Sequence, residues 1–204
     1  IACANRTLVW SVYFNDINDS GETEFLYQKR KVNPKAGRIL IFPGSFNPLH
    51  DGHLKMREMA EKRTGMRATF EICAKNADKP PLTFYEIKRT LDQFDDNDSW
   101  VMTSAGRFSE KAEMFPNSVF IIGADTFMRV FDEKFYLNKK DMLNHVERFN
   151  DHNIHFLVFG RMVQDKFISL RDIVIPESIK HRCTGFDEAS FRDDISSTKL
   201  RLED

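Results

Sequence analysis

Short apolar runs alternate with amphipathic patterns along most of the chain. The run RILIF at 38–42 is continuous and apolar, which is typical of a strand buried on both faces. Four more runs of this kind predict strands, and the stretches between the runs carry the spacing of helices that bury one face. The predicted strands are 38–42, 68–74, 100–105, 118–124 and 154–160, and the predicted helices are 53–64, 83–94, 109–115, 125–131 and 139–150.

Alternating strands and helices predict an α/β fold, namely a Rossmann-like, doubly wound parallel sheet of about five strands with helices on both faces. The helix at 83–94 has a start signal, because Thr83 is followed three residues later by Glu86, as in a capping box. In such sheets ligands bind beyond the carboxyl ends of the strands, where the strand order reverses. One crevice is therefore expected among the loops at 44–53, 75–82, 123–127 and 160–165.

The first 37 residues have a different character. The apolar run at 6–14 predicts a strand, and the polar, charged residues that follow it are rich in turn formers, as in a linker. We therefore interpret residues 1–37 as the tail of an upstream domain plus a linker, and residues 38–204 as the main domain.

The composition limits the kinds of molecule that the protein is expected to bind. The 204 residues carry a formal net charge of −1, so bulk charge favours neither a nucleic acid nor an anionic membrane as partner. The apolar runs are too short to span a bilayer and no signal-peptide pattern is present, so a cytoplasmic protein is expected. The three cysteines lack CxxC spacing, and no set of metal ligands stands out. Homo-oligomer formation is left open.

The turn after the first predicted strand, GSFNPLHDGH at 44–53, combines features of an anion site. Gly44 allows a phosphate to approach the backbone, and the helix that begins near Gly52 points its free amides at the same space. His50 and His53 can donate hydrogen bonds to phosphate oxygens, and Lys55 adds charge. The alternative is a tight turn with two surface histidines, and either histidine alone would favour that alternative.

A second helix start rich in hydroxyl groups lies near the carboxyl end. Ser196, Ser197 and Thr198 offer donors there, with Arg201 one turn later. Simple N-capping by one hydroxyl is the alternative. Two such helix starts in one chain favour a polyphosphate ligand, because a triphosphate needs donors on more than one side.

These residues carry a resemblance to a known family. GSFNPLHDGH resembles the GxFxPxHxGH signature of the nucleotidylyltransferase superfamily, and ISSTKLR at 195–201 resembles its ISSTxxR signature. IIGADT at 121–126 looks like the GxD element with which nicotinamide and nicotinate mononucleotide adenylyltransferases hold the nucleoside of ATP. The resemblance covers residues 38–202. As a string GxD is weak, and its position after the fourth predicted strand is what gives it weight.

The resemblance implies a role for each matching residue. Backbone contacts to the nucleotides would come from Gly44, Ser45 and Phe46, and Gly123 and Asp125 would meet the ribose or base. His50, His53 and Arg201 would be catalytic, and Ser196, Ser197 and Thr198 would help Arg201 to hold the β and γ phosphates. The acceptor phosphate would attack the α-phosphorus of ATP or CTP, and pyrophosphate would leave. Mg²⁺ would be bound through the substrate phosphates and water.

The sequence says least about the acceptor, the phosphorylated molecule that would receive the nucleotidyl group. Lys75, Asn76 and Lys79 in the loop at 75–82 and Arg161 after the fifth strand are candidates for binding it, although a solvated loop is a close alternative. Pyridine-nucleotide members often stack the pyridine on a Trp after GxD, but Trp10 and Trp100 lie outside that interval. The aromatic residues that would substitute for it also fit a stripe facing the core, namely Phe127, Phe131, Phe135 and Tyr136.

Residues 1–15 resemble the closing strand of a nicotinamide-nucleotide amidase domain of the competence-damage type. That resemblance implies a covalently linked upstream deamidase and, with the GxD element, favours ATP and nicotinate mononucleotide as substrates. Two alternatives stay open: a cytidylyltransferase that uses CTP, and a non-catalytic nucleotide sensor of the same fold.

Overall fold

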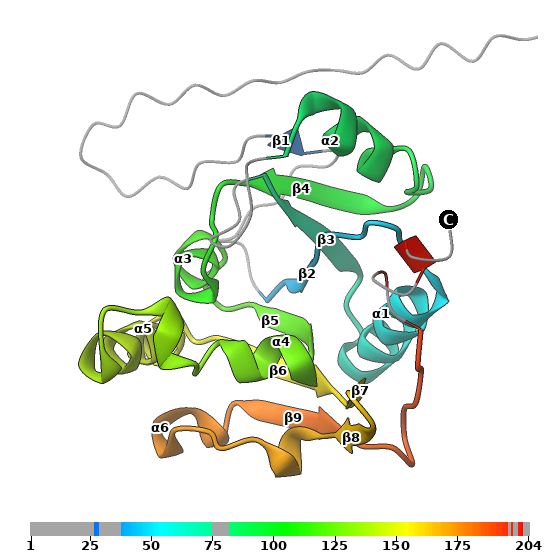
Figure 1. Cartoon of the computed structure of the whole chain (residues 1–204). Coiled ribbons are helices and arrows are strands. Elements are labelled where there is room, and N and C mark those ends of the chain that lie inside the picture. The colour runs from blue at the N-terminus through cyan, green and yellow to red at the C-terminus, as the bar shows by residue number, and fades with distance from the viewer. Residues whose placement is uncertain (1–26, 29–37, 75–81, 196, 198–199, 202–204) are drawn as a thin grey trace, which may run out of the picture.

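The computed structural model of the chain describes residues 27–28, 38–74, 82–195, 197 and 200–201. A seven-stranded sheet runs through them in the order β1-β4-β3-β2-β5-β6-β9 (Figure 1). Six strands are parallel, and β1 is antiparallel to its neighbour β4. The strands are β1 (Tyr27–Gln28), β2 (Leu40–Pro43), β3 (Ala68–Cys73), β4 (Ser99–Thr103), β5 (Val119–Gly123), β6 (His155–Phe159) and β9 (Cys183–Phe186).

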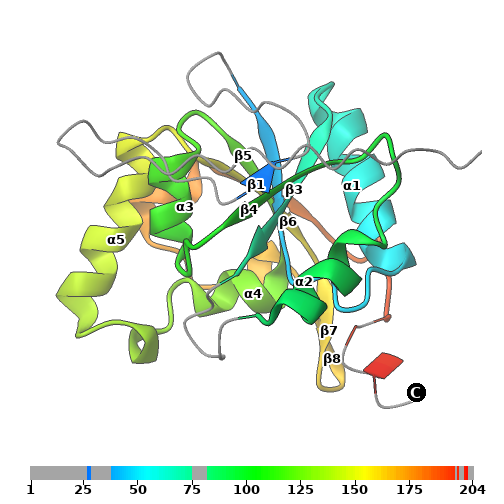
Figure 2. The ribbon, with the colours of Figure 1, turned by 90° about the horizontal axis from the view of Figure 1, so that it is seen from above.

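Helices cover both faces of the sheet, as the view from above shows (Figure 2). The predicted doubly wound α/β fold is confirmed, and all five predicted helices are present. The largest boundary difference is at the second helix, which ends at Leu91 instead of residue 94. The helices are α1 (Asp51–Thr64), α2 (Phe84–Leu91), α3 (Phe108–Met114), α4 (Ala124–Arg129), α5 (Lys139–Asp151) and α6 (Glu177–Lys180), with 3₁₀ turns η1 (Glu133–Phe135) and η2 (Leu170–Asp172).

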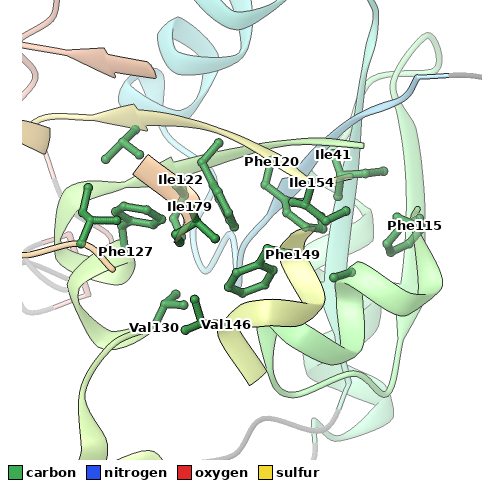
Figure 3. Close-up of a cluster of buried hydrophobic side chains, with 14 of the residues drawn as sticks. Ile41, Phe115, Phe120, Ile122, Phe127, Val130, Val146, Phe149, Ile154 and Ile179 are labelled. Carbon is green, nitrogen blue, oxygen red and sulfur yellow. The ribbon is translucent and has the colours of Figure 1, made fainter. Parts of the chain in front are cut away.

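Two apolar cores form because successive strand residues point to opposite faces. In β2, Leu40 packs into a core beneath α1 and α2, whereas Ile41 packs into a core beneath α3, α4 and α5. Figure 3 shows the second of these, which contains Phe120 of β5 and Phe149 of α5. Burial on both faces explains why the parallel strands read as continuous apolar runs.

The prediction of about five strands missed β9. Its sequence, Cys-Thr-Gly-Phe, has no apolar run, and its middle residues Thr184 and Gly185 are exposed. β9 is an edge strand that pairs with β6 alone, so its place depends on backbone hydrogen bonds that side-chain periodicity does not report. A hairpin that was also not predicted, β7 (Arg161–Val163) with β8 (Lys166–Ile168), follows β6.

The capping box predicted at the second helix is confirmed. The Thr83 amide donates to Glu86 Oε2 at 2.8 Å, and the Glu86 amide donates to Thr83 Oγ1 at 3.3 Å. Two of the four amides at this helix start are thereby satisfied locally.

Most of segment 1–37 lies outside the described residues, including the predicted strand at 6–14. Its described part, Tyr27–Gln28, pairs with Val101 and Met102 of β4, so this piece of the predicted linker adds to the sheet edge. The assignment of the remainder to an upstream domain stays a prediction. Among the residues that are described, none of the helices combines the length and apolar character needed to cross a membrane.

The strand order reverses between β2 and β5. From β2 the chain proceeds outward through β3 and β4, and from β5 it proceeds the other way through β6 and β9. The loops that leave the carboxyl ends of β2 and β5 therefore flank the point at which ligands usually bind in sheets of this kind.

Candidate functional site

The loop after β2 is shaped by core packing. The buried ring of Phe46 lies so close to Gly44 that a Cβ there would be 2.6 Å from the ring. Phe46 has a left-handed φ of 44° and packs edge-on against Phe42 and Phe70. Sequence reasoning explained Gly44 by phosphate approach, and packing against Phe46 is a second requirement. Ser45 between them is exposed.

The side chain of Gln93 stabilises the loop after β2 by hydrogen bonds to its backbone. Its side-chain amide donates to Phe46 O at 2.9 Å and accepts from the Leu49 amide at 2.7 Å. Because both bonds are to backbone, they fix the path of the loop between Phe46 and the helix start. Sequence reasoning placed Gln93 inside the second helix, whereas it lies two residues beyond its end.

His50 and His53 lie together at the start of α1. Their rings stack with centroids 3.8 Å apart, and the His50 amide donates to His53 Nδ1 at 3.4 Å. Because Nδ1 accepts this bond, the neutral ring of His53 carries its proton on Nε2, which can donate to a ligand. His50 is buried, and among the described residues neither of its ring nitrogens has a hydrogen-bond partner. Buried imidazole nitrogens usually have a hydrogen-bond partner, so both are free to bond to a ligand or to water.

Both imidazoles are neutral at physiological pH. Burial, with smaller contributions from the neighbouring His50 and Arg161, lowers the pKa of His53 to about 3. Burial and Arg161 also lower the pKa of His50, against the opposing effect of Asp193 and Asp51. At this pH the two rings can offer N–H donors to a ligand but carry no fixed positive charge.

The pH dependence of stability should report this burial. A proton binds His53 in the unfolded chain near pH 6.5 but in the folded protein only near pH 3, so folding weakens as the pH falls through this window. Urea unfolding at pH 7.5 and pH 5 should show that His53→Gln removes about 2 kcal/mol of the acid-induced loss. The exposed His181→Gln control should retain it. Equal losses in wild type and His53→Gln would contradict the buried state of the ring.

The carboxyl-terminal signature reaches the same loop. Ser197 Oγ donates to Pro48 O at 2.9 Å, and the Arg201 guanidinium donates to Asn47 O. Residues almost 150 positions apart in the sequence thus meet beside His50. Ser196 and Thr198, predicted to act with them, lie outside the described residues.

The GxD element lies at the carboxyl end of β5, the strand that pairs with β2. Gly123 is the last residue of β5 and the N-cap of α4, and Asp125 follows in the first turn with its side chain half exposed. Arg161, the residue that begins β7, places its Nε 4.0 Å from Asp125 Oδ1. Its Nη1 is buried and has no partner among the described residues, and its charge acts on both histidines. The structure thus brings Arg161 to the histidines, whereas the sequence suggested only a role in acceptor binding.

Lys55 does not face the site freely. Its ammonium pairs with Asp193 Oδ2 at 2.8 Å, and the Ile195 amide donates to Asp193 Oδ1 at 3.1 Å. Burial alone would raise the pKa of Asp193, but the hydrogen bonds from Lys55 and Ile195 outweigh it and the pKa is lowered. A Cβ at Gly52 would lie 3.1 Å from both Asp193 and His50, so a larger residue here would require one of these side chains to shift. Asp193 was missed from sequence, although it stands two residues before the second signature.

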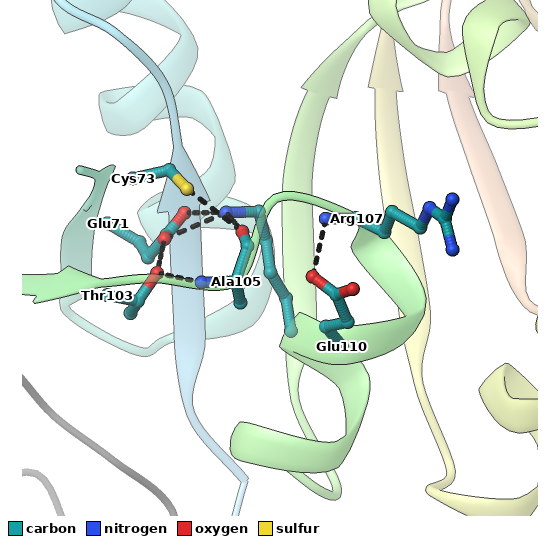
Figure 4. A network of polar contacts seen from close by, with 7 residues as sticks. Glu71, Cys73, Thr103, Ala105, Arg107 and Glu110 are labelled. Carbon is teal, nitrogen blue, oxygen red and sulfur yellow. Dashed lines mark hydrogen bonds and ion pairs between the residues drawn. The ribbon is translucent and has the colours of Figure 1, made fainter. Parts of the chain in front are cut away.

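A buried ion pair lies beneath the ends of β3 and β4 (Figure 4). Lys111 Nζ of α3 donates to both carboxylate oxygens of Glu71, at 2.8 and 2.7 Å, and to Ala105 O at 2.7 Å. Thr103 Oγ1 donates to the same carboxylate, so every polar atom of the pair is satisfied. The Gly44 amide donates to Glu71 O at 3.0 Å, which ties this network to the loop of the site. The sequence offered one signal for this pair, because Glu71 is a charged residue within the apolar run at 68–74.

The proposed acceptor residues are only partly placed. Lys75, Asn76 and Lys79 lie outside the described residues. Phe127 is fully buried in the core and cannot stack on a ligand, and Phe131 packs edge-on against it. Phe135 and Tyr136 are partly exposed, so a stacking role for them stays a prediction.

Comparison with known proteins adds a family relationship. The model of the cytidylyltransferase-like family matches residues 41–203. Among solved structures, the chain resembles the nicotinic acid mononucleotide adenylyltransferase of Plasmodium falciparum, solved in complex with NaAD. The two chains are 17% identical, the match covers 81% of this chain and 83% of that chain, and the TM-score is 0.44. No curated protein sequence matches.

Proposed function

The chain belongs to the cytidylyltransferase-like family, and we propose that it transfers the AMP group of ATP to nicotinate mononucleotide with release of pyrophosphate. The observation that carries the proposal is the meeting of two signature segments on one loop. Ser197 and Arg201 bond to the backbone at Asn47 and Pro48, directly before the unpaired, buried ring of His50. A polyphosphate requires hydrogen-bond donors from several elements, and the two signatures bring such donors to one loop.

Catalysis here needs positioning and charge stabilisation rather than a protein nucleophile. The acceptor phosphate attacks the α-phosphorus, the bond to the bridging oxygen breaks, and pyrophosphate departs with the electron pair. His53 Nε2–H and the His50 ring would donate to phosphate oxygens as negative charge shifts to the leaving group. Arg161, with a buried unpaired Nη1 beside both rings, would supply the fixed positive charge that the neutral histidines lack.

Magnesium would bind mainly through the substrate. The buried carboxylate of Asp193 is engaged by Lys55 and the Ile195 amide, so it is not available as a ligand. Mg²⁺ retains several waters and readily uses phosphate oxygens. We therefore propose that the ion is bridged by the triphosphate, and we assign no residue to it.

The choice of ATP and nicotinate mononucleotide rests on sequence features. The GxD element at 123–125 is of the pyridine-nucleotide type, and residues 1–15 resemble the end of a deamidase whose product would be nicotinate mononucleotide. The carboxylate of Asp125 is half exposed, which supports the proposal that it accepts hydrogen bonds from ribose hydroxyls or a base.

Product formation tests the proposal. The full chain is incubated with Mg²⁺, with ATP or CTP, and with nicotinate mononucleotide, nicotinamide mononucleotide or other phosphorylated acceptors. Mass spectrometry then detects the product, and a coupled assay detects pyrophosphate. Nicotinate adenine dinucleotide is expected from ATP. A product only from CTP would identify a cytidylyltransferase, and triphosphate binding without any product would favour a sensor.

Two substitutions should produce defects of different kinds. Asp125→Ala should mainly raise the KM for ATP, because Asp125 contacts the nucleoside in ground state and transition state alike. Arg201→Ala should mainly lower kcat, because its interaction with the departing pyrophosphate strengthens during transfer. Arg192→Ala, an exposed arginine on the same segment that pairs with Asp194, is the matched control and should change neither. Identical defects in the two variants would contradict these roles.

A further inference from the structure

Three basic side chains meet at the edge of the sheet opposite the candidate site, where the parallel strands begin. Arg38 stands two residues before β2, His155 is the first residue of β6, and Arg182 immediately precedes β9. Arg38 Nη2 lies 3.4 Å from His155 Nε2, and Arg182 Nη1 lies 3.5 Å from the same nitrogen. Two guanidinium groups from different strands thus converge on one imidazole.

Arg182 is held in place by neutral groups. Its Nε donates to Asn150 Oδ1 at 2.6 Å, and its Nη1 donates to Asn153 Oδ1 at 2.9 Å. Asn153 is braced in turn, because its Nδ2 donates to Asn117 Oδ1 at 3.1 Å. The guanidinium is therefore oriented in advance while its charge stays uncompensated.

The cluster has more donors than acceptors. In the described part of the chain, neither Arg38 nor Arg182 forms an ion pair with a carboxylate. The pKa of His155 is lowered by burial and then by Arg38, Arg182 and His181, so every charged group that acts on this ring is a cation. His155 therefore stays neutral. Its Nε2 is a single weak acceptor, and both guanidinium donors lie near the upper distance limit for a hydrogen bond to it. Like charges at such separation are unfavourable unless an anion lies between them.

We propose that Arg38, His155 and Arg182 form a second anion-binding site, for the phosphate group of a small molecule. A tetrahedral oxyanion accepts from two guanidinium forks at once, which a single imidazole nitrogen cannot do. Its charge would also favour protonation of His155, which then becomes a third donor. The hydrogen bonds of Arg182 to Asn150 and Asn153 are explained if they stabilise the turn between α5 and β6. That structural role does not explain why Arg38, two residues before β2, also approaches His155.

Histidine resonances in the full-length protein test the site directly. Inorganic phosphate is titrated at constant ionic strength and pH, and the imidazole signals are followed by NMR. The His155 signal should shift saturably, and Arg38→Gln should weaken the binding at least about fivefold, the loss expected for one charge-assisted hydrogen bond. Arg38 is exposed, so this variant should fold normally. Arg171→Gln, an exposed arginine at a different edge, is the matched control and should leave the midpoint unchanged.

The test is independent of the proposed catalytic function, because His50 and His53 have their own resonances and His53→Gln should not alter the His155 response. A non-saturable shift, or the same midpoint in Arg38→Gln, would overturn the proposal. AMP is titrated in parallel to distinguish the source of the phosphate. Tighter binding of AMP than of phosphate, weakened likewise by Arg38→Gln, supports a phosphate ester as ligand, and equal affinity supports free phosphate.

Discussion

His53→Ala is expected to lower the rate of nucleotidyl transfer by about 10²-fold or more, the scale observed when one preorganised donor to developing charge is removed. The structure indicates which atom of His53 would be this donor. The ring is neutral, its Nδ1 accepts from the His50 amide, and its Nε2–H remains to donate to the phosphates. Steady-state kinetics with ATP should show the loss in kcat, since the hydrogen bond strengthens as charge moves to the leaving group.

The same substitution also affects packing, so it needs a matched control. His53 contacts the rings of Phe46 and His50, and its removal should cost some stability. His145 is a comparable histidine outside the site, half-buried against Tyr136 and hydrogen-bonded to Ser109 Oγ at 2.8 Å. His145→Ala should lose stability but retain its rate per folded molecule. If His53→Ala behaves in that same way, the histidine is structural.

Lys111→Met should lower the free energy of unfolding by about 3–5 kcal/mol, because it leaves the carboxylate of Glu71 buried without its cation. Glu71 is fully buried, and Lys111 is its closest charged partner at 2.7 Å. Urea denaturation measures the loss. The loop after β2 should be affected as well, because Glu71 O accepts a hydrogen bond from the Gly44 amide.

A surface pair provides the comparison. Lys88 and Asp92 form an exposed ion pair at 2.8 Å on α2, and Lys88→Met there should cost less than about 1 kcal/mol. The double variant Glu71→Gln, Lys111→Met should be more stable than Lys111→Met alone, because no unpaired charge remains inside. A Lys111→Met variant as stable as Lys88→Met would show that burial does not make this pair critical.

Several features of the site could not be read from sequence, and the reasons are physical. Gln93 and Glu71 hold the loop after β2 by hydrogen bonds, and Asp193 pairs with Lys55 of α1, each from a distant position in the chain. Their roles depend on which strands become neighbours, and a short-range pattern does not report that. Arg161 was identified as a candidate, but its electrostatic effect on both histidines depends on the tertiary structure.

The sequence by itself determined the alternation of strands and helices, the capping box at Thr83 and the two signatures that identify the family, because these depend on local spacing and side-chain chemistry. Tertiary structure alone decided that β9 joins the sheet, that the two signatures meet at the loop of His50, and that both histidines are neutral. Pairing of a polar edge strand, contact between distant segments and burial of an imidazole are consequences of how the whole chain packs.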